Sequence, residues 1–416
     1  MNRLPLACGI AALLACAQAG AANTPSMEEL WQLVQKQQAE IEALKQQLQS
    51  TQQNVAKQEQ QSQATEQKLV ANEQLIAETD ASVQEILDRP PSKSEWAENT
   101  QIGGYGELHY NGGDADQIDF HRFVLFFGHQ FSDRVRLNTE LELEHSLAGD
   151  GAPGEVELEQ AYIEFDINSS LRTKAGLFLL PIGMLNEVHE PPTFYGVERN
   201  PIESRIIPTT WWEAGASLSG EFSPSLRWDA AVHSGLATSA SSNYAVRNGR
   251  QKVAEALADD LAYTFRLRYL PIPGLQLAAN YQRQEDITQS QDPLAGGADL
   301  WSAHAIWNVN GFGLKALWAR WNLDGAGPRS LGADVQKGYF IEPSYQFNKH
   351  WGVFARYNEW DNRAGDRIDS EFQQTDVGVN FWPHPNVVLK ADYQFQSLPN
   401  GGDGDDRINL GVGYQF

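Results

Sequence analysis

The pattern of apolar and polar positions changes twice along the chain, and each change predicts a new kind of element. Residues 1–22 join a basic Arg3 to an apolar stretch that ends in small residues, which is typical of a cleaved secretory signal peptide. In residues 27–89 apolar residues recur every seven positions, and after about residue 100 the repeat falls to two. We therefore expect an exported protein in which a long helix precedes a set of β-strands.

The seven-residue repeat predicts a coiled coil. Every seventh residue from Met27 to Val83 gives a series in which eight of nine residues are apolar. The companion series from Leu30 to Ile86 has six polar residues among nine, so a tight dimer fits poorly and three strands are favoured. We expect a periplasmic coiled-coil stalk over 23–90 in a homotrimer, then a linker over 91–100. The alternative is a disordered Gln-rich leader.

The two-residue repeat covers 101–416, as in the segments 137–143 and 408–416, and each such segment has one apolar and one polar face. Sixteen segments of this kind are centred near residues 105, 125, 140, 161, 175, 217, 229, 265, 280, 303, 317, 342, 355, 377, 391 and 411. Tight turns alternate with longer Gly-, Asp- and Ser-rich loops between them. This sorting favours an all-β, 16-stranded antiparallel transmembrane β-barrel, closed because lipid cannot satisfy a free strand edge. A soluble β-sandwich is the alternative.

Aromatic residues gather near the ends of the segments, where interfacial girdles of a barrel would lie. The residues in question are Trp211, Trp212, Trp301, Trp307, Trp318, Trp321, Trp351, Trp360, Phe381 and Trp382.

Charge and composition exclude several classes of function. The 416 residues carry a formal net charge of −23, which argues against a nucleic-acid partner. The only cysteines, Cys8 and Cys16, lie in the predicted signal peptide, so we expect no disulfide and no thiolate metal site; a lipidated Cys16 is the alternative. His189-Glu190 precedes two prolines and cannot form a helical zinc motif. We expect no enzyme activity, cofactor or metal.

Two motifs resemble known outer-membrane proteins. The C-terminal residues Asn409, Gly411, Tyr414 and Phe416 have the spacing of the signal that such barrels present to the barrel-assembly machinery. The stretch 176–215 resembles the third-loop region of the phosphate-selective porin family of the O/P type. The resemblance implies a trimeric sixteen-stranded channel in the outer membrane of a Gram-negative cell. Some members are dicarboxylate channels with an N-terminal periplasmic coiled coil, so phosphate itself is not implied.

The longest connection, 181–208, follows the fifth strand, where porins of this size fold a loop into the lumen. An extracellular or trimer-contact loop is the alternative. The constriction residues expected on it are Glu187, His189, Glu190, Tyr195, Glu198, Arg199, Glu203 and Arg205. Strand alternation predicts that the pore is lined by Arg122, Arg136, Glu140, Glu142, Arg172, Lys174, Arg266, Arg268, Arg356, Lys390 and Asp392.

Together these features predict a porin for passive diffusion of small hydrophilic solutes, leaning toward anions such as carboxylates or phosphate. The inward charges have a plainer interpretation as groups that hydrate the lumen. The alternative function is a structural tether from the outer membrane to the cell wall through the coiled coil. Acidic residues on the predicted outer loops could contact lipid and lipopolysaccharide through divalent cations.

Overall fold

A computed structural model describes residues 93–416 and, before them, seven isolated positions between 28 and 45 that have helical conformation. The predicted signal peptide 1–22 and nearly all of the predicted coiled coil 23–90 lie outside the described residues. The chain divides into two units, Met1–Pro90 and Pro91–Phe416. Only the second is considered below. No helix in the described part is long and apolar enough to cross a membrane.

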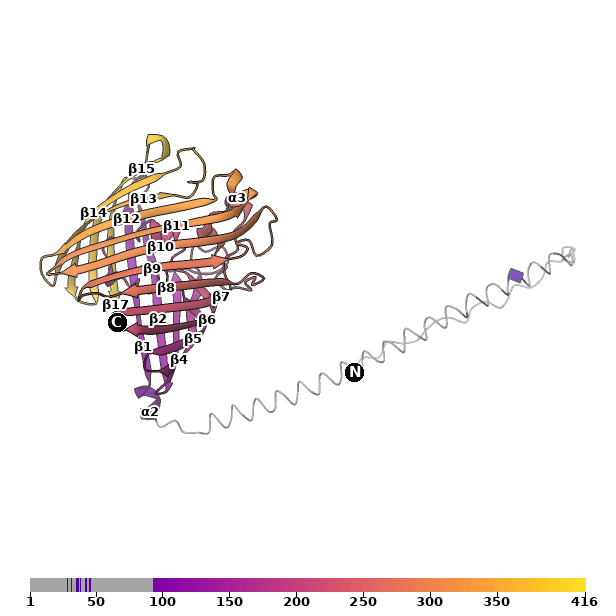
Figure 1. Ribbon diagram of the computed structural model, residues 1–416, viewed down its shortest axis with the longest axis horizontal. Helices are drawn as coiled ribbons and strands as arrows, with labels where there is room; N and C mark the ends of the chain where they lie inside the picture. Colours follow the sequence, from indigo (N-terminus) through magenta and orange to yellow (C-terminus); the bar gives the residue numbers. More distant parts are fainter. Residues whose placement is uncertain are drawn as a thin grey trace, which may run out of the picture. The chain divides into compact units, whose positions relative to one another are not determined.

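The second unit is almost entirely β-structure (Figure 1). A short helix α2 (Lys93–Glu98) leads into it. The strands are β1 (Thr100–Gly112), β2 (Gln117–Ser132), β3 (Val135–Glu144), β4 (Val156–Asn168), β5 (Leu171–Leu179), β6 (Trp212–Ser223), β7 (Leu226–His233), β8 (Ala262–Tyr269), β9 (Leu275–Gln284), β10 (Ala295–Val309), β11 (Phe312–Gly325), β12 (Val335–Gln346), β13 (Trp351–Asp361), β14 (Phe372–His384), β15 (Val387–Leu398), β16 (Gly402–Asp403) and β17 (Arg407–Gln415). The short helical turns are η1 (Pro191–Thr193), η2 (Ile202–Ile206), η3 (Ala240–Ser242), η4 (Val246–Gly249), α3 (Ala326–Ser330) and η5 (Pro399–Gly401).

The strands form a closed antiparallel ring. Each strand from β1 to β15 pairs with the next, β15 pairs with β17, and β17 pairs with β1. The two-residue β16 pairs only with β15, inside the last loop. The barrel therefore has sixteen long strands, and the predicted sixteen-stranded antiparallel barrel is confirmed. All sixteen predicted segments fall within these strands, and the predicted tight turns lie at one end of the ring.

Closure of the ring depends on the last residues of the chain. The amide of Gly104 donates to the carbonyl of Phe416 at 3.0 Å, and the amide of Phe416 donates to the carbonyl of Gly104 at 2.9 Å. At Gly104 a side chain would collide with the backbone of Val124 on the neighbouring strand. A glycine here lets three strands approach closely where the barrel closes.

The two faces of the wall differ as the alternation predicts. On β15, Leu389 is 42% exposed on the outer face, whereas its neighbour Lys390 is 5% exposed on the inner face. Phe265 and Ile341 are likewise exposed outward, and apolar side chains on this face suit contact with lipid.

The predicted aromatic girdle is correct only in part. Four of its tryptophans, Trp301, Trp307, Trp318 and Trp351, are exposed as expected. However, Trp211, Trp212, Trp321 and Trp360 are buried, and the indole of Trp382 donates to the carbonyl of Pro192 in the loop after β5. These five point into the barrel, because the same strand ends that meet the membrane interface also meet loops packed inside the lumen.

Candidate pore constriction

The connection between β5 and β6, residues 180–211, is called here the inner loop, because it crosses the interior of the barrel. The amide of Val197 donates to Asp392 on β15 at 2.7 Å, and Lys390 donates to the carbonyl of Gly196 at 2.8 Å. Another part of the loop contacts β11, where the indole of Trp321 donates to the carbonyl of Ile206 at 3.0 Å. Since β11 and β15 lie at separate positions around the ring, the loop contacts several inner walls.

Buried polar side chains hold the inner loop in shape. The carboxylate of Glu203 accepts from the amides of Met184 and Leu185 at 2.6 and 2.7 Å and from the Asn200 side chain at 2.9 Å. Burial raises the pKa of Glu203. Asn186 ties the two ends of the loop together, because its side chain bonds with the carbonyl of Leu180 and with both backbone groups of Trp211. The backbone polar groups of this inward loop are thus partly satisfied by its own side chains.

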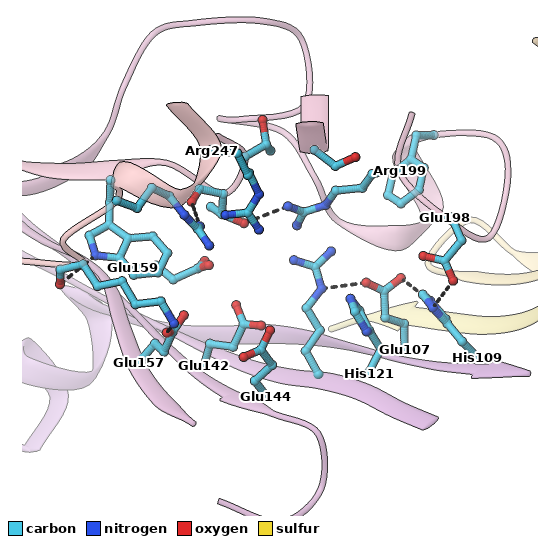
Figure 2. A pocket seen from close by; sticks show the side chains of 18 of the residues that line it. Glu107, His109, His121, Glu142, Glu144, Glu157, Glu159, Glu198, Arg199 and Arg247 are labelled. Carbon is cyan, nitrogen blue, oxygen red and sulfur yellow. Dashed lines mark hydrogen bonds and ion pairs between the residues drawn. The ribbon is translucent and has the colours of Figure 1, made fainter. Parts of the chain in front are cut away.

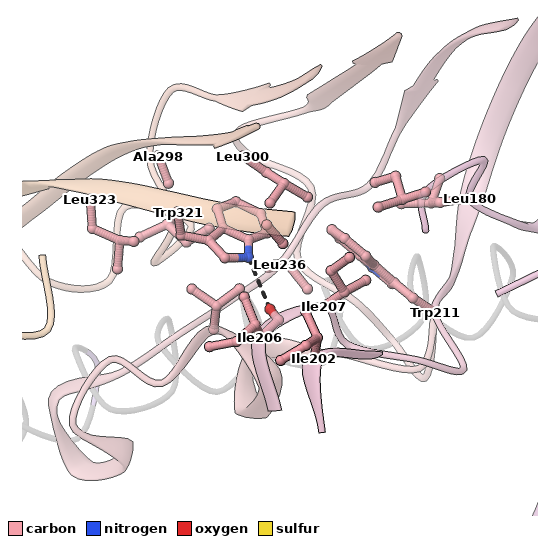
Figure 3. Close-up of a cluster of buried hydrophobic side chains, with 14 of the residues drawn as sticks. Leu180, Ile202, Ile206, Ile207, Trp211, Leu236, Ala298, Leu300, Trp321 and Leu323 are labelled. Atoms are coloured by element: carbon pink, nitrogen blue, oxygen red, sulfur yellow. Dashed lines mark hydrogen bonds between the residues drawn. The ribbon is translucent and has the colours of Figure 1, made fainter. Parts of the chain in front are cut away.

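A cluster of apolar side chains occupies one side of the lumen, and this side is called here the apolar half (Figure 3). Ile202, Ile206 and Trp211 of the inner loop pack there against the wall and against the connection between β7 and β8. The wall and connection contribute Leu236, Tyr244, Val246, Ala298, Leu300, Leu317, Ala319, Trp321, Leu323, Phe340 and Trp360. These packed apolar side chains exclude water from the space that they occupy.

The other half of the lumen contains a charged cavity of about 310 Å³, here called the central cavity (Figure 2). Its lining includes the carboxylates Glu107, Glu142, Glu144, Glu157, Glu159 and Glu198 and the permanent cations Arg122, Arg199, Arg205, Arg247, Arg250 and Lys252. Most of the carboxylates come from the wall strands β1, β3 and β4, and most of the cations come from the two long connections. Figure 2 shows Glu142, Glu144 and Glu157 facing Arg199 and Arg247. These wall carboxylates thus lie across the cavity from Arg199 and Arg247, whereas Arg122 and Lys252 lie beside carboxylates of the wall.

The cations of the central cavity differ in their pairing. Arg122 donates to Glu107 at 2.6 Å, and Lys252 forms ion pairs with Glu155 and Glu157. By contrast, within residues 93–416 no carboxylate oxygen lies within 4.0 Å of the guanidinium groups of four arginines; these are Arg199, Arg205, Arg247 and Arg250. We call these four the arginine cluster.

The arginine cluster carries like charges close together. Burial, and after it the proximity of Arg250 and Arg199, lowers the pKa of Arg247 to about 9. Two members are oriented by neutral groups, since Arg199 donates to the Thr210 hydroxyl at 2.9 Å and Arg250 donates to the Thr210 carbonyl. Like charges held together without a directly paired carboxylate favour the entry of an anion.

A second cavity of about 330 Å³ lies near the tight turn between β4 and β5 and is called here the turn-side cavity. Asp229 is its main carboxylate: it accepts from Arg266 at 2.7 Å and lies 3.5 Å from Arg268. Further lining residues are Glu164, Arg172, Lys174, Glu187 and Arg227. In this cavity the cations outnumber the carboxylates by one, whereas in the central cavity the two numbers are equal.

The residues predicted to line the pore all lie on inward-facing strand positions, but only some face a cavity. Arg122 and Glu142 line the central cavity, and Arg172, Lys174, Arg266 and Arg268 line the turn-side cavity. Arg136 pairs instead with Glu164 and Asp166 on the neighbouring strand.

Four predicted pore residues are covered by the inner loop. Glu140, Arg356, Lys390 and Asp392 are each at most 6% exposed. Arg356 pairs with Asp376 and Glu342, and Lys390 and Asp392 bond to the loop backbone. These four side chains contact the wall or the loop and are nearly inaccessible, and their role in lining the pore stays a prediction.

The residues predicted on the inner loop have equally mixed positions. Glu198, Arg199 and Arg205 line the central cavity, and Glu187 pairs with Arg266 in the turn-side cavity. His189 is buried, Glu190 is half-buried, and Tyr195 packs on Phe354 and Trp382. Glu203 lies within the loop itself, as described above. The C-terminal motif lies on β17 and after it, where Asn409 donates to Asp392 and Gly411 faces Val197.

Sequence reasoning missed the basic residues of the β7–β8 connection. Arg247, Arg250 and Lys252 occur within six positions of a strongly acidic chain, and that local excess of positive charge was the available signal. Glu107, Glu157, Glu159 and Asp229 were also missed, although each lies on a recognised strand.

The sequence is similar to a known family model and to a known protein. Residues 227–401 match a family model described as Gram-negative porin. An uncharacterized protein of Aquifex aeolicus (strain VF5) is 30% identical over 337 residues, which cover 73% of this chain and 77% of that protein.

Solved structures with a similar fold include an anion-selective porin from Comamonas acidovorans, with a TM-score of 0.52 and 12% identity over 76% of this chain and 99% of the other. OmpF of Salmonella typhi in complex with daunomycin has a TM-score of 0.51 and 13% identity, over 76% and 98% of the two chains. The trimer form of OmpT, an outer-membrane protein of Vibrio cholerae, has a TM-score of 0.52 and 9% identity, over 76% and 99%. At these identities the likeness concerns the fold alone.

Proposed function

We propose that this chain, of which residues 227–401 match the Gram-negative porin model, is an outer-membrane channel for small solutes that passes small anions in preference to cations. Passage is by passive diffusion. The observation that carries the proposal is the arginine cluster, whose four guanidinium groups lie at the central cavity without a carboxylate partner in the described chain.

The selectivity of the cavity depends on which of its charges lack a partner of opposite sign. The central cavity has as many carboxylates as permanent cations, so its net charge alone selects neither sign. Arg122 and Lys252 are already paired with carboxylates of the wall, whereas the arginine cluster is not. The cluster offers four unpaired guanidinium groups, against the two unpaired wall carboxylates Glu142 and Glu144, so a mobile anion gains more at the cluster than a mobile cation gains at the wall. Guanidinium groups present paired donors that suit the two oxygens of a carboxylate or phosphate.

The turn-side cavity gives weaker support to the same proposal, because its five cations exceed its four carboxylates but four of these cations are ion-paired. Arg172, Lys174 and Arg227 line it together with Arg266 and Arg268, against Glu164, Glu187 and Asp229 and one further carboxylate, Glu221. We infer that an anion passes from the arginine cluster to this second basic site. Two sites of moderate strength allow release as well as entry, which conduction requires.

The test is the reversal potential of single channels in a KCl gradient. The proposal predicts a reversal potential that is shifted toward the equilibrium potential of chloride. It also predicts a larger anion preference when a dicarboxylate replaces chloride at low concentration. A reversal potential of the opposite sign would show cation preference and overturn the proposal.

We propose further that residues 1–22 direct export and that 23–90 form a periplasmic coiled coil joined to the barrel 101–416 by the linker 91–100. The apolar series from Met27 to Val83 supports this, and it favours a homotrimer. The trimer form of the Vibrio cholerae protein is consistent with that state. Deletion of residues 23–90 should preserve conductance in planar bilayers. Cross-linking of the full-length and deleted proteins in detergent would then show whether the segment strengthens the trimer.

A further inference from the structure

Three buried polar side chains meet where the inner loop contacts the wall of β3 and β4. His189 comes from the loop, Glu140 from β3 and Glu159 from β4, and they are 3%, 2% and 1% exposed. The Nε2 atom of His189 lies 3.6 Å from Oε1 of Glu140 and 3.7 Å from Oε2 of Glu159. None of these three atoms has a hydrogen-bond partner in the described chain.

The surrounding bonds fix how these atoms are presented. Nδ1 of His189 lies 3.1 Å from the carbonyl of Asn186, so it carries a hydrogen and leaves Nε2 directed at the two carboxylates. The other oxygen of Glu140 accepts from Gln160 at 2.6 Å. A backbone carbonyl that orients the second nitrogen of a histidine, and a hydrogen bond that orients a ligating carboxylate, are the usual outer contacts of a metal site.

The distances are too long for hydrogen bonds and suit a shared metal ion. A separation of 3.6 or 3.7 Å exceeds the range of N–H···O bonds. Ligand atoms about 2.0–2.2 Å from a tetrahedral zinc ion are separated from one another by roughly 3.4 Å. The three atoms also lie within 4.8 Å of one another, so one ion can reach all of them.

We propose that Glu140, Glu159 and His189 form a binding site for a divalent transition-metal ion, with zinc as the best fit. An imidazole nitrogen with two carboxylate oxygens suits zinc better than calcium or magnesium, which prefer all-oxygen ligand sets. The ion would compensate two buried carboxylates that otherwise face each other across a histidine. It would join the inner loop to the wall opposite the apolar half and so fix the width of the passage.

In two similar clusters of the described chain, carboxylates have a direct hydrogen-bond or ion-pair partner within the cluster. Glu144, Glu155 and Glu157 lie around the ammonium of Lys252, which pairs with two of them. In the cluster of Asp119, His121 and His145, the last residue bonds directly to the carboxylate at 2.8 Å. The site of Glu140, Glu159 and His189 has no such internal partner. Glu159 also lines the central cavity, which gives an ion a route from the lumen.

The experiment uses the full-length protein in detergent, stripped with EDTA and then titrated with Zn²⁺ by calorimetry, with bound metal counted by mass spectrometry after gel filtration. We expect one zinc ion per subunit in the wild type. E159Q and H189Q should bind at least about tenfold more weakly. E157Q, on the same strand, and H145Q, in the outer cluster, are matched controls and should bind as the wild type does.

Absence of stoichiometric zinc in the wild type, or equal binding by E159Q, H189Q and the wild type, would overturn the proposal. In that case His189 is an imidazolium that bridges the two carboxylates. If the variants fail to fold, as judged by heat-modifiable gel mobility, the absorption spectrum of Co²⁺ added to the wild type tests the site instead. Absorption bands of four- or five-coordinate cobalt support the site, and a spectrum of hexaaquo cobalt alone contradicts it.

Discussion

The two halves of the lumen differ in the chemistry of the side chains that they contain. In the apolar half, side chains of the inner loop interlock with wall residues such as Leu300 and Trp321, and water is excluded. In the charged half, the same loop presents Arg199 and Arg205 to an open cavity. A single loop thus packs into one half of the barrel and contributes charged side chains to the other half. The packing in the first half therefore determines where the charges of the second half are held.

The largest expected effect comes from breaking the apolar half. Trp321→Ala removes a fully buried indole that also donates to the carbonyl of Ile206, and we expect a loss of about 3–5 kcal/mol in the free energy of unfolding. Single-channel conductance should become larger and noisier as the loop loosens. Denaturant titration and bilayer recording measure both. Trp301→Ala, which truncates a lipid-facing indole that is 52% exposed, is the control and should leave the conductance unchanged.

The next effect comes from the hydrogen bonds that shape the loop itself. Glu203→Ala leaves the amides of Met184 and Leu185 buried without an acceptor, at a cost of about 1–3 kcal/mol for each unsatisfied group. Thermal unfolding should shift down, and limited proteolysis should cut the loop faster. Glu190→Ala, on the same loop but half-buried, should show a much smaller shift. Equal shifts in the two variants would contradict the role given to Glu203.

A change in the charged half should alter selectivity and leave stability almost unaffected. Arg247→Gln combined with Arg250→Gln removes half of the arginine cluster, and we expect the reversal potential in a KCl gradient to move substantially toward cation preference. Arg283→Gln is the matched control, because Arg283 pairs with Glu285 and Asp299 on the outer side of β9. If both variants shift the potential equally, the cluster does not determine selectivity.

The smallest effect is expected where a charge is already paired. Lys252→Gln releases Glu155 and Glu157 from their ion pairs. Partly exposed pairs contribute about 0–1 kcal/mol, so stability should hardly change. The freed carboxylates should reduce anion preference slightly, and high salt should abolish the difference from wild type. Reversal potentials recorded at two salt concentrations test this.

Much of the barrel could be predicted from the sequence, because alternation is a local property of each strand. The segment 137–143 reveals its inward Glu140 and Glu142 without any knowledge of its neighbours. Similarly, the apolar face of β17 and its terminal Phe416 indicated a closing strand. The tight turns were recognisable for the same reason, since Pro, Gly and Asn act locally.

The interior could not be predicted in the same way, because it depends on contacts between distant parts of the chain. Trp321 appears from its neighbours to be an interfacial residue, and only the presence of Ile206 inside the barrel explains its burial. Arg247 belongs to a long connection whose direction no local pattern specifies. His189 meets Glu140 and Glu159 across three separate elements, with none of the short spacing that marks a metal motif.

The central claim is that the inner loop closes the apolar half and leaves the charged half as the passage. The most direct measurement is modification of single cysteines by an anionic methanethiosulfonate reagent during bilayer recording, with Cys8 and Cys16 replaced by alanine. Cysteine in place of Arg247 should react within seconds and reduce the current, whereas cysteine in place of the fully buried Ala319 should not react. Rapid reaction at position 319, or no change in current after modification at position 247, would contradict the account.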